Sequence, residues 1–296
     1  MSDKLWRFSN LLSQGEYDFL VANPQPDIND DIDIARLRNS GFFDGVRETN
    51  GQDADDELAI QYTWGKNRRG VPSHLVRNAV FGVRRRNRIQ LNKAKIITEG
   101  NVTISVTGES LDQSDMDVFL ECINLCKEAG SFRASTSQRS FMGSLGMRCG
   151  GRAAEVLKSH IQRMHNYQIE IETANGDIFS THMIMQYYIN KKGLMVHLSK
   201  ELIDILNRGT TWIDVRKRKA LSTDLEKWMH CFVSSHKAEK PIYRSIEDLH
   251  NMTSSRLAIA KFKFELFKAM DCLEDKSVIK DWKPINGSKA ICFTKK

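Results

Sequence analysis

The sequence predicts one order of secondary structure twice: a short helix, a turn, a longer helix and a β-hairpin. In the first copy, hydroxyl residues cap a short helix in 135–147, "RCGG" forms the turn, and 152–167 form the longer helix. In the second copy, the short helix covers 243–253, the longer helix covers 254–276 with a serine cap, and 277–296 form a hairpin around an Asn-Gly turn. This is the order of a winged helix-turn-helix, in which the second helix enters the major groove of DNA.

Two such units predict an α+β fold with two tandem winged helix-turn-helix domains behind a loosely ordered acidic arm. We expect a partly disordered arm at 1–65, a first winged-helix DNA-binding domain with a basic lead segment at 66–198, and a second one at 199–296. Gly, Pro, Asn and Asp interrupt the arm too often for long elements. Residues 1–60 hold 13 acidic and 5 basic residues, so the remainder carries a net charge of +15. A body this basic indicates a polyanionic partner.

The segments around the two copies also have recognisable patterns. Residues 89–111 are rich in β-branched residues on both sides of a turn, which predicts a hairpin. Residues 112–130 predict a helix with acids in its first turn and a glycine after its end. Two alternating runs, 167–179 with an Asn-Gly turn and 182–199, follow the first longer helix. A short helix is predicted over 199–206, and a helix capped at Ser222 or Thr223 is predicted within 214–236.

The densest positive charge precedes the first predicted hairpin. Between Gln61 and Thr98 there are ten Lys or Arg residues and no Asp or Glu. We hypothesise that "NRRG" and "RRRNR" flank a short helix and clamp phosphates, because Lys and Arg contacts to phosphate supply most of the affinity for DNA. A solvated basic linker is the alternative.

The two longer helices supply the other candidate contacts. Phosphate contacts set register, and base contacts come from the outward face of a recognition helix. A charged helix face is often only a solvated surface, and this alternative stays open. Phe262, Phe264 and Phe267 cannot all face the core of one helix, so one of them contacts DNA or a partner, or the helix is partly unwound. The candidate DNA-binding residues are Arg84, Arg85, Arg86, Arg88, Arg152, Lys158, Ser159, Gln162, Ser255, Arg256, Lys261 and Lys263.

The sequence shows little that predicts catalysis. "WGKNRRG" is not a Walker A loop, and no His-apolar-His pair of the kind found in rolling-circle nicking enzymes is present. His182 precedes a run with Tyr187 and Tyr188, which makes a nicking tyrosine a weak alternative. We therefore expect no enzyme activity, no catalytic or metal-binding residues and no cofactors.

The cysteines and hydropathy bear on the compartment. Cys122 and Cys126 are four residues apart on an apolar helix, which favours core packing over metal binding. No signal-peptide pattern and no apolar run of about 18 residues is found. These patterns predict a cytoplasmic protein with free thiols and no membrane partner.

Three spaced motifs in this chain resemble those of TrfA-type plasmid replication initiator proteins. The first is a basic P-x4-R-x-A-x-F segment, the second a strand ending in a T-G-x-E-L-like pattern, and the third a K-L-S…M…F-S-S-H pattern. The resemblance covers about residues 64–296 in the same order. The matching residues are Pro72, Arg77, Ala79 and Phe81 in the first motif, Val102, Ile104, Thr107, Gly108, Glu109 and Leu111 in the second, and Lys219, Leu221, Ser222, Met229, Phe232, Ser234, Ser235 and His236 in the third.

The resemblance implies two winged-helix domains without a catalytic site. It implies binding to double-stranded DNA with direct repeats at a plasmid origin, opening of adjacent A/T-rich DNA, and recruitment of host replication proteins, namely the initiator, the helicase and the sliding clamp. It also implies self-association, with monomers that bind DNA and dimers that regulate. The family often carries a glutamine-led clamp-binding motif, but the corresponding position here reads "DDELA" over 55–59, without the glutamine or an aromatic residue.

Three other functions fit parts of the sequence. A winged-helix transcriptional repressor would have the same architecture, but its gene should lie beside an inverted repeat rather than direct repeats. A nicking replication enzyme would cleave single-stranded DNA with a metal ion. An RNA-binding or structural basic protein would show no preference for repeat DNA.

Overall fold

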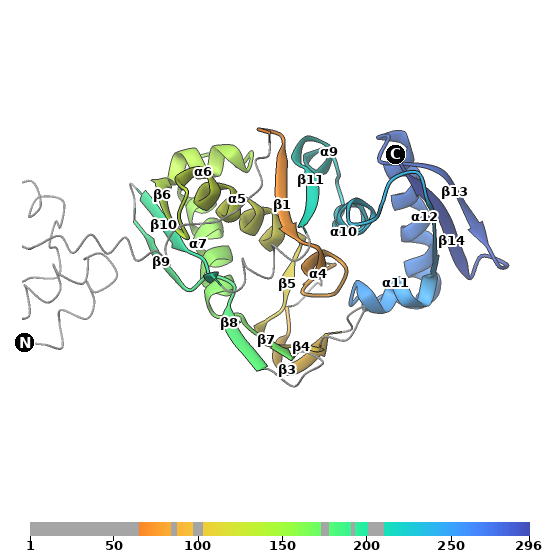
Figure 1. Ribbon diagram of the computed structural model, residues 1–296, viewed down its shortest axis with the longest axis horizontal. Helices are drawn as coiled ribbons and strands as arrows, with labels where there is room; N and C mark the ends of the chain where they lie inside the picture. Colours follow the sequence, from red (N-terminus) through yellow and green to blue (C-terminus); the bar gives the residue numbers. More distant parts are fainter. Residues whose placement is uncertain (1–64, 84–87, 97–102, 173–177, 191–192, 201–209) are drawn as a thin grey trace, which may run out of the picture. The chain divides into compact units, whose positions relative to one another are not determined.

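The computed structural model has a mixed α+β fold, in which helices pack with several small sheets (Figure 1). Most of the predicted acidic arm, nearly all of the predicted helix over 199–206 and the first Asn-Gly turn lie outside the described residues. The described residues are 65–83, 88–96, 103–172, 178–190, 193–200 and 210–296.

Helix α5 (Gln113–Ala129) is the central helix of the first hydrophobic core, and it confirms the helix predicted over 112–130. The Asp112 carboxylate accepts from the backbone N–H groups of Ser114 and Asp115, and the Asp115 carboxylate accepts from the Asp112 N–H in return. Gly130 ends the helix in the left-handed conformation, with φ of 63°. Cys122 and Cys126 are buried in this core, as predicted.

Along the chain, the first helix pair is preceded and followed by strands of one three-stranded antiparallel sheet. The strand β6 precedes the pair, the hairpin of β9 and β10 follows it, and the strand order is β6-β10-β9. The short helix with a hydroxyl cap is confirmed, because the Ser137 hydroxyl accepts from Ser140 N–H at the start of the helix. The residues before it, 133–137, pair as a strand that was not predicted from the sequence. The bounds are β6 Arg133–Ser137, α6 Gln138–Ser144, α7 Gly151–His165, β9 Gln186–Ile189 and β10 Gly193–His197.

A second sheet adjoins the first copy. Two of its strands precede the copy, and the other two lie between α7 and β9 along the chain. The predicted hairpin of 89–111 is confirmed, and its strands continue into a second hairpin that follows α7 directly, in the antiparallel order β3-β4-β7-β8. One face of this sheet is buried through Ile104, Val106, Ile169 and Ile171, which alternate with partly exposed residues. The bounds are β3 Gln90–Ile96, β4 Thr103–Glu109, β7 Gln168–Glu172 and β8 Ile178–His182.

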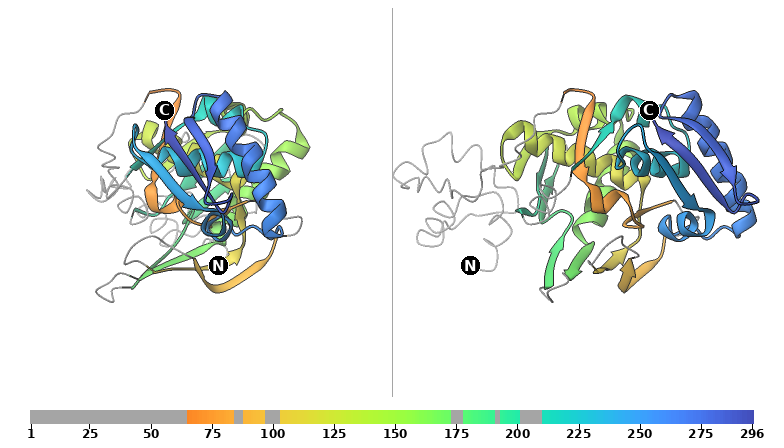
Figure 2. Two further views of the ribbon diagram at one scale, coloured as in Figure 1. Left: turned by 90° about the vertical axis from the view of Figure 1, so that its right-hand side faces the viewer. Right: turned by 45° about the vertical axis from the view of Figure 1, so that its right-hand side comes forward.

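The second copy repeats the arrangement of the first. Its sheet has the order β12-β14-β13, so the strand before the short helix again pairs with the last strand of the hairpin. Figure 2 shows this sheet beside α12. Asn286 and Gly287, with φ of 52° and 61°, form the predicted Asn-Gly turn. The bounds are α10 Asp224–Ser234, β12 Pro241–Ser245, α11 Ile246–Met252, α12 Ile259–Asp275, β13 Ile279–Ile285 and β14 Ala290–Lys295.

Two helix starts in the second copy test the predicted caps. Thr223 caps α10 and forms a reciprocal capping box with Glu226, which confirms one of the two predicted cap positions. The predicted serine cap of the last long helix is wrong. That helix begins at Ile259, its N-cap is Ala258 without a side-chain hydrogen bond, and the preceding residues form the turn after α11.

The two copies have separate hydrophobic cores. The first gathers side chains from Val71 to Leu198 together with Ile213 and Cys231, and the second gathers those from Leu221 to Phe293. A two-stranded antiparallel ladder of β1 and β11 connects the start of the described chain to its second half. The predicted division at 198/199 stays a prediction. The remaining bounds are β1 Arg68–Pro72, α4 Ser73–Val76, β2 Phe81–Gly82, β5 Leu111–Asp112, β11 Thr210–Asp214 and α9 Val215–Lys219.

Candidate nucleic-acid interface

Helix α7 presents a polar face to solvent. Leu157, Ile161 and Met164 are buried at helical spacing, so the opposite side of the helix is exposed. All four residues predicted on this helix, Arg152, Lys158, Ser159 and Gln162, lie among its exposed residues. Their positions agree with an outward recognition face, and their contact with DNA stays a prediction.

The predicted residues of the second copy lie in two places. Ser255 and Arg256 are in the turn before α12 rather than on the helix, and Ser255 Oγ accepts from Leu257 N–H at 3.3 Å. Lys261 is exposed on the first turn of α12. Lys263 is partly exposed, with Nζ 5.6 Å from the Phe267 ring centroid. The turn and the start of α12 together therefore hold this group of cations.

The three phenylalanines of α12 have different surroundings. Phe262 is fully buried, and the Phe267 ring lies 5.5 Å from the ring of Trp282. The Phe264 side chain is 58% exposed, and Lys268 Nζ lies 4.2 Å from its ring centroid. The prediction that they cannot all face the core is confirmed. The helix is continuous through them, so the alternative of partial unwinding is wrong.

Arg88 is engaged with acidic residues at the start of α5. Its guanidinium lies 2.6 Å from Asp112 Oδ2 and 2.8 Å from Asp115 Oδ2. The other Asp115 oxygen contacts His160 Nδ1 at 2.7 Å and Arg163 Nη1 at 2.6 Å, both from α7. Burial raises the pKa of Asp115, but the His160 hydrogen bond and the charges of Arg88 and Arg163 outweigh burial and lower it to about 2. Arg88 thus holds α5 in place, and its contact with DNA stays a prediction.

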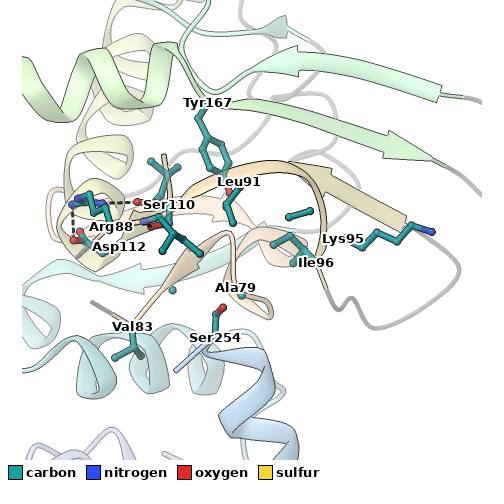
Figure 3. Close-up of a pocket in the computed structure, with 14 residues that line it drawn as sticks. Ala79, Val83, Arg88, Leu91, Lys95, Ile96, Ser110, Asp112, Tyr167 and Ser254 are labelled. Atoms are coloured by element: carbon teal, nitrogen blue, oxygen red, sulfur yellow. Dashed lines mark hydrogen bonds and ion pairs between the residues drawn. The ribbon is translucent and has the colours of Figure 1, made fainter. Parts of the chain in front are cut away.

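A small pocket lies beside this ion-pair cluster, under the strand β3 (Figure 3). Its volume is about 130 Å³. In Figure 3 the Tyr167 ring points toward Leu91, while Arg88 and Asp112 contact each other at one side. Since these two charged groups already neutralise each other, the pocket gives no separate indication of a ligand. The predicted contacts Arg84, Arg85 and Arg86, which lie in sequence between the lining residues Val83 and Arg88, are outside the described residues.

The turn of the last hairpin and the surroundings of α6 carry exposed basic residues that were not predicted from the sequence as DNA contacts. Lys283 and Lys289 are exposed on either side of the turn between β13 and β14. In the first copy, Arg139 and Arg148 are exposed around α6. Lys283 and Lys289 could have been predicted from the sequence, because they flank an Asn-Gly turn that follows a helix pair.

Arg218 connects the two cores. It is fully buried, and Nε donates to Asp117 Oδ1 on α5 at 2.6 Å. Nη2 donates to the backbone and side-chain oxygens of Gln113, and Nη1 donates to Lys227 O at 3.1 Å and to Cys231 Sγ at 3.0 Å. Burial raises the pKa of Asp117, but Arg218 and Lys227 outweigh burial and lower it. One guanidinium therefore joins α5 of the first copy to α10 of the second.

The first and third motifs of the initiator resemblance meet in space. Arg77 Nε donates to Ser235 Oγ at 2.9 Å, and a second guanidinium nitrogen donates to the Ser235 carbonyl. Trp228 Nε1 donates to the carbonyl of Asn78 at 3.1 Å. Phe81 packs in the first core and Phe232 in the second. These motif residues therefore hold the two copies together, which is a structural role.

A histidine pair bears on the nicking alternative. The rings of His165 and His182 stack with centroids 6.0 Å apart, and the Tyr187 ring meets His165 edge-on at 5.2 Å. His165 Nδ1 lies 3.0 Å from the backbone carbonyl oxygen of Ile184, and His182 Nδ1 lies 2.7 Å from the backbone carbonyl oxygen of His165. The second histidine that the sequence search lacked is therefore beside His182 in the fold. Among the described residues, no three His, Cys, Asp or Glu side chains are grouped as for a metal ion.

Comparisons with known proteins give a likeness in fold. The sequence matches no protein-family model and no curated protein. A structure of selenomethionine derivatives of domains 2 and 3 of RctB is similar, with a TM-score of 0.53 and 9% identity, covering 75% of this chain and 96% of that chain. A second structure of RctB domains 2 and 3 has a TM-score of 0.51 with the same identity and coverage. No helix within the described ranges is long and apolar enough to cross a membrane.

Proposed function

We propose that this chain is a plasmid replication initiator that binds direct repeats at an origin, promotes opening of the adjacent A/T-rich DNA and recruits host replication proteins. The observation that carries the proposal is the repeated arrangement of the two copies. Each has a strand, a short helix, a turn and a longer helix with an outward face, and then a hairpin that pairs with the first strand, in the orders β6-β10-β9 and β12-β14-β13.

In this proposal both copies are winged helix-turn-helix domains. The recognition helices are α7 and α12, and the hairpins β9–β10 and β13–β14 are the wings. The exposed donors and acceptors of α7 suit base edges in the major groove, and the exposed lysines of the second wing suit phosphates. Two such modules in one chain fit a DNA site that spans two successive major grooves, about one helical turn apart.

The origin-binding part of the proposal has two supports of different kinds. The spaced motifs resemble those of TrfA-type initiators. The hydrogen bond of Arg77 with Ser235 joins the first of these motifs to the third. The likeness to RctB domains 2 and 3 supports a two-domain division of the matched part of the chain. This support concerns the fold only and does not bear on the TrfA-type family. Interconversion of monomers and dimers and binding to host factors belong to the proposal through the resemblance alone, and residues 55–59 lack the glutamine and the aromatic residue of the family's clamp-binding motif.

The proposed activity is binding without catalysis. The pair of His165 and His182 next to Tyr187 is the specific observation that favours the other class, a nicking replication enzyme. Incubating the chain with single-stranded origin DNA and Mg²⁺ or Mn²⁺ separates the two classes. The proposal predicts intact DNA. A cleaved product that disappears with Tyr187→Phe would assign the nicking function instead.

Footprinting on the DNA beside the gene for this chain tests the proposal. We expect several directly repeated sites, each protected over two major-groove segments about one turn apart. Protection of a single inverted repeat would favour the transcriptional repressor, which shares the proposed architecture. Uniform protection without defined sites would leave only a basic polyanion binder.

A further inference from the structure

The proposed recognition helices of the two copies present chemically different faces. On α7, most exposed positions, among them Arg152, Glu155, Ser159 and Gln162, carry hydrogen-bonding groups, and Val156 is a large apolar side chain exposed among them. On α12, Ala260, Phe264 and Lys268 recur every four residues and form one exposed ridge, on the side of the helix opposite the buried Phe262 and Leu266.

The ridge on α12 is apolar at its start. Ile259 is 49% exposed and Phe264 is 58% exposed, with the exposed Ala260 between them. None of these three side chains can donate or accept a hydrogen bond. Ile259 and Phe264 are exposed on the first two turns of the same helix, so contact with a single partner would remove both from water.

The charges around the ridge decide what kind of partner fits. Lys261, Lys263 and Lys268 surround it, and the first turn of α12 contains no acid. Arg256 is exposed in the turn just before. A surface with this many cations suits a polyanion better than the apolar face of another protein. The ridge thus combines phosphate-binding charges with an apolar centre.

We infer that α12 reads thymine, through contact of Phe264, Ile259 and Ala260 with the 5-methyl groups that thymines present in the major groove. The thymine methyl is the apolar feature of that groove, and small apolar or Phe side chains are its usual protein contacts. This inference rests on the proposed function and adds the base preference of the second copy. The half-site under α12 is rich in A·T pairs, while the half-site under α7 is read by hydrogen bonds.

The test replaces thymine by deoxyuracil, which removes the methyl group and leaves base pairing intact. Duplexes that bind the full chain are first selected from a random pool, and thymines are then replaced in one half-site at a time. Each contacted methyl should account for about three- to fourfold in affinity, as expected for burial of one methyl group. Replacement in the half-site under α7 should change affinity less.

Phe264→Ala gives the matching change on the protein side. This variant should bind the thymine duplex more weakly than the wild-type chain does, and it should distinguish the two duplexes less, because only the contacts of Ile259 and Ala260 remain. Ile178→Ala, at a residue that is 66% exposed on β8, is the control and should behave like wild type. Far-ultraviolet circular dichroism of both variants verifies that the fold is kept.

Two outcomes would overturn the inference. Specific binding with equal affinity for thymine and deoxyuracil duplexes would refute thymine reading and leave the proposed DNA-binding function standing. A change of sedimentation coefficient in Phe264→Ala, without a change in DNA discrimination, would assign the ridge to contact between two copies of the chain. Failure to select any preferred duplex would refute the proposed function itself.

Discussion

Arg218 Nε donates a 2.6 Å hydrogen bond to Asp117 Oδ1, which lies 101 residues earlier in the sequence. The arginine belongs to the short helix before the second core, and the aspartate lies on the central helix of the first. In the proposed function the two recognition helices belong to different copies, so the geometry between the cores would set the spacing of the DNA segments that they contact. This ion pair is therefore linked to function through structure rather than through contact with DNA.

Arg218→Met should be strongly destabilising. Methionine fills much of the space but leaves the buried oxygens of Gln113 and the partly exposed Asp117 carboxylate without their donor, which should cost about 3 kcal/mol, the low end for a broken buried pair. Urea unfolding monitored by tryptophan fluorescence measures the effect. Arg216→Met, on the exposed side of the same short helix, should change the free energy of unfolding by less than about 0.5 kcal/mol. Equal stability of the two variants would show that the buried pair is dispensable.

His230 should make stability depend on pH in the mildly acidic range. Burial, and then the charge of Arg218, lowers its pKa from 6.5 to about 3. Below pH 6.5 the unfolded chain binds a proton that the folded chain does not bind, so stability is present above pH 6.5 and is lost as pH falls toward 3. From pH 7 to pH 5 this one group should remove about 2 kcal/mol of the free energy of unfolding.

Comparison with His230→Gln isolates this effect. The variant should lose about 2 kcal/mol less than wild type between pH 7 and pH 5, because glutamine does not titrate. The Asp115 carboxyl, with its pKa lowered to about 2, acts only below about pH 4 and does not interfere with this window. If wild type and variant lose the same free energy, His230 is not the titrating group.

Arg152→Ala should reduce discrimination between DNA sites more than it reduces general affinity. The side chain is exposed at the start of α7, where a recognition helix contacts base edges. Loss of one base-edge contact should cost about 1–3 kcal/mol at one base pair. Competition between the selected site and its single-base variants measures this cost. A uniform loss on every duplex would instead assign Arg152 to a phosphate contact.

Joint replacement of Arg84, Arg85 and Arg86 by alanine should weaken binding to all duplexes alike. If these residues clamp phosphates, the slope of log K against log salt should become shallower by up to about 0.9 for each lost contact. Arg88→Ala is the informative comparison, since Arg88 is held by Asp112 and Asp115 and its loss should lower stability instead. An unchanged slope in the triple variant would return the segment to the role of a basic linker.

The sequence predicted those parts of the fold that depend on local periodicity and caps. The central helix, the terminal hairpin with Asn286 and Gly287, and the exposed face around Arg152 follow from such signals. The strands β6 and β12 were missed because they end at the helix caps Ser137 and Ser245 and are formed by ladders with strands far along the chain, which no local pattern shows.

The long-range contacts could not have been predicted in the same way. Nothing local distinguishes Arg218 from its basic neighbours, and its burial is decided by acceptors on α5 and α10. His165 and His182 are 17 residues apart and meet because the β7–β8 hairpin returns to the end of α7. The contact of Arg77 with Ser235 also depends on the packing of the two cores.

A gel-shift titration of the full chain tests the central claim most directly. The probes are duplex DNA from beside its gene and the same DNA with shuffled sequence, each at two salt concentrations. The account predicts strong preference for the natural duplex, with stepwise bands equal in number to its direct repeats. Equal, salt-sensitive binding to both duplexes would contradict it, because affinity would then come from phosphate contacts alone.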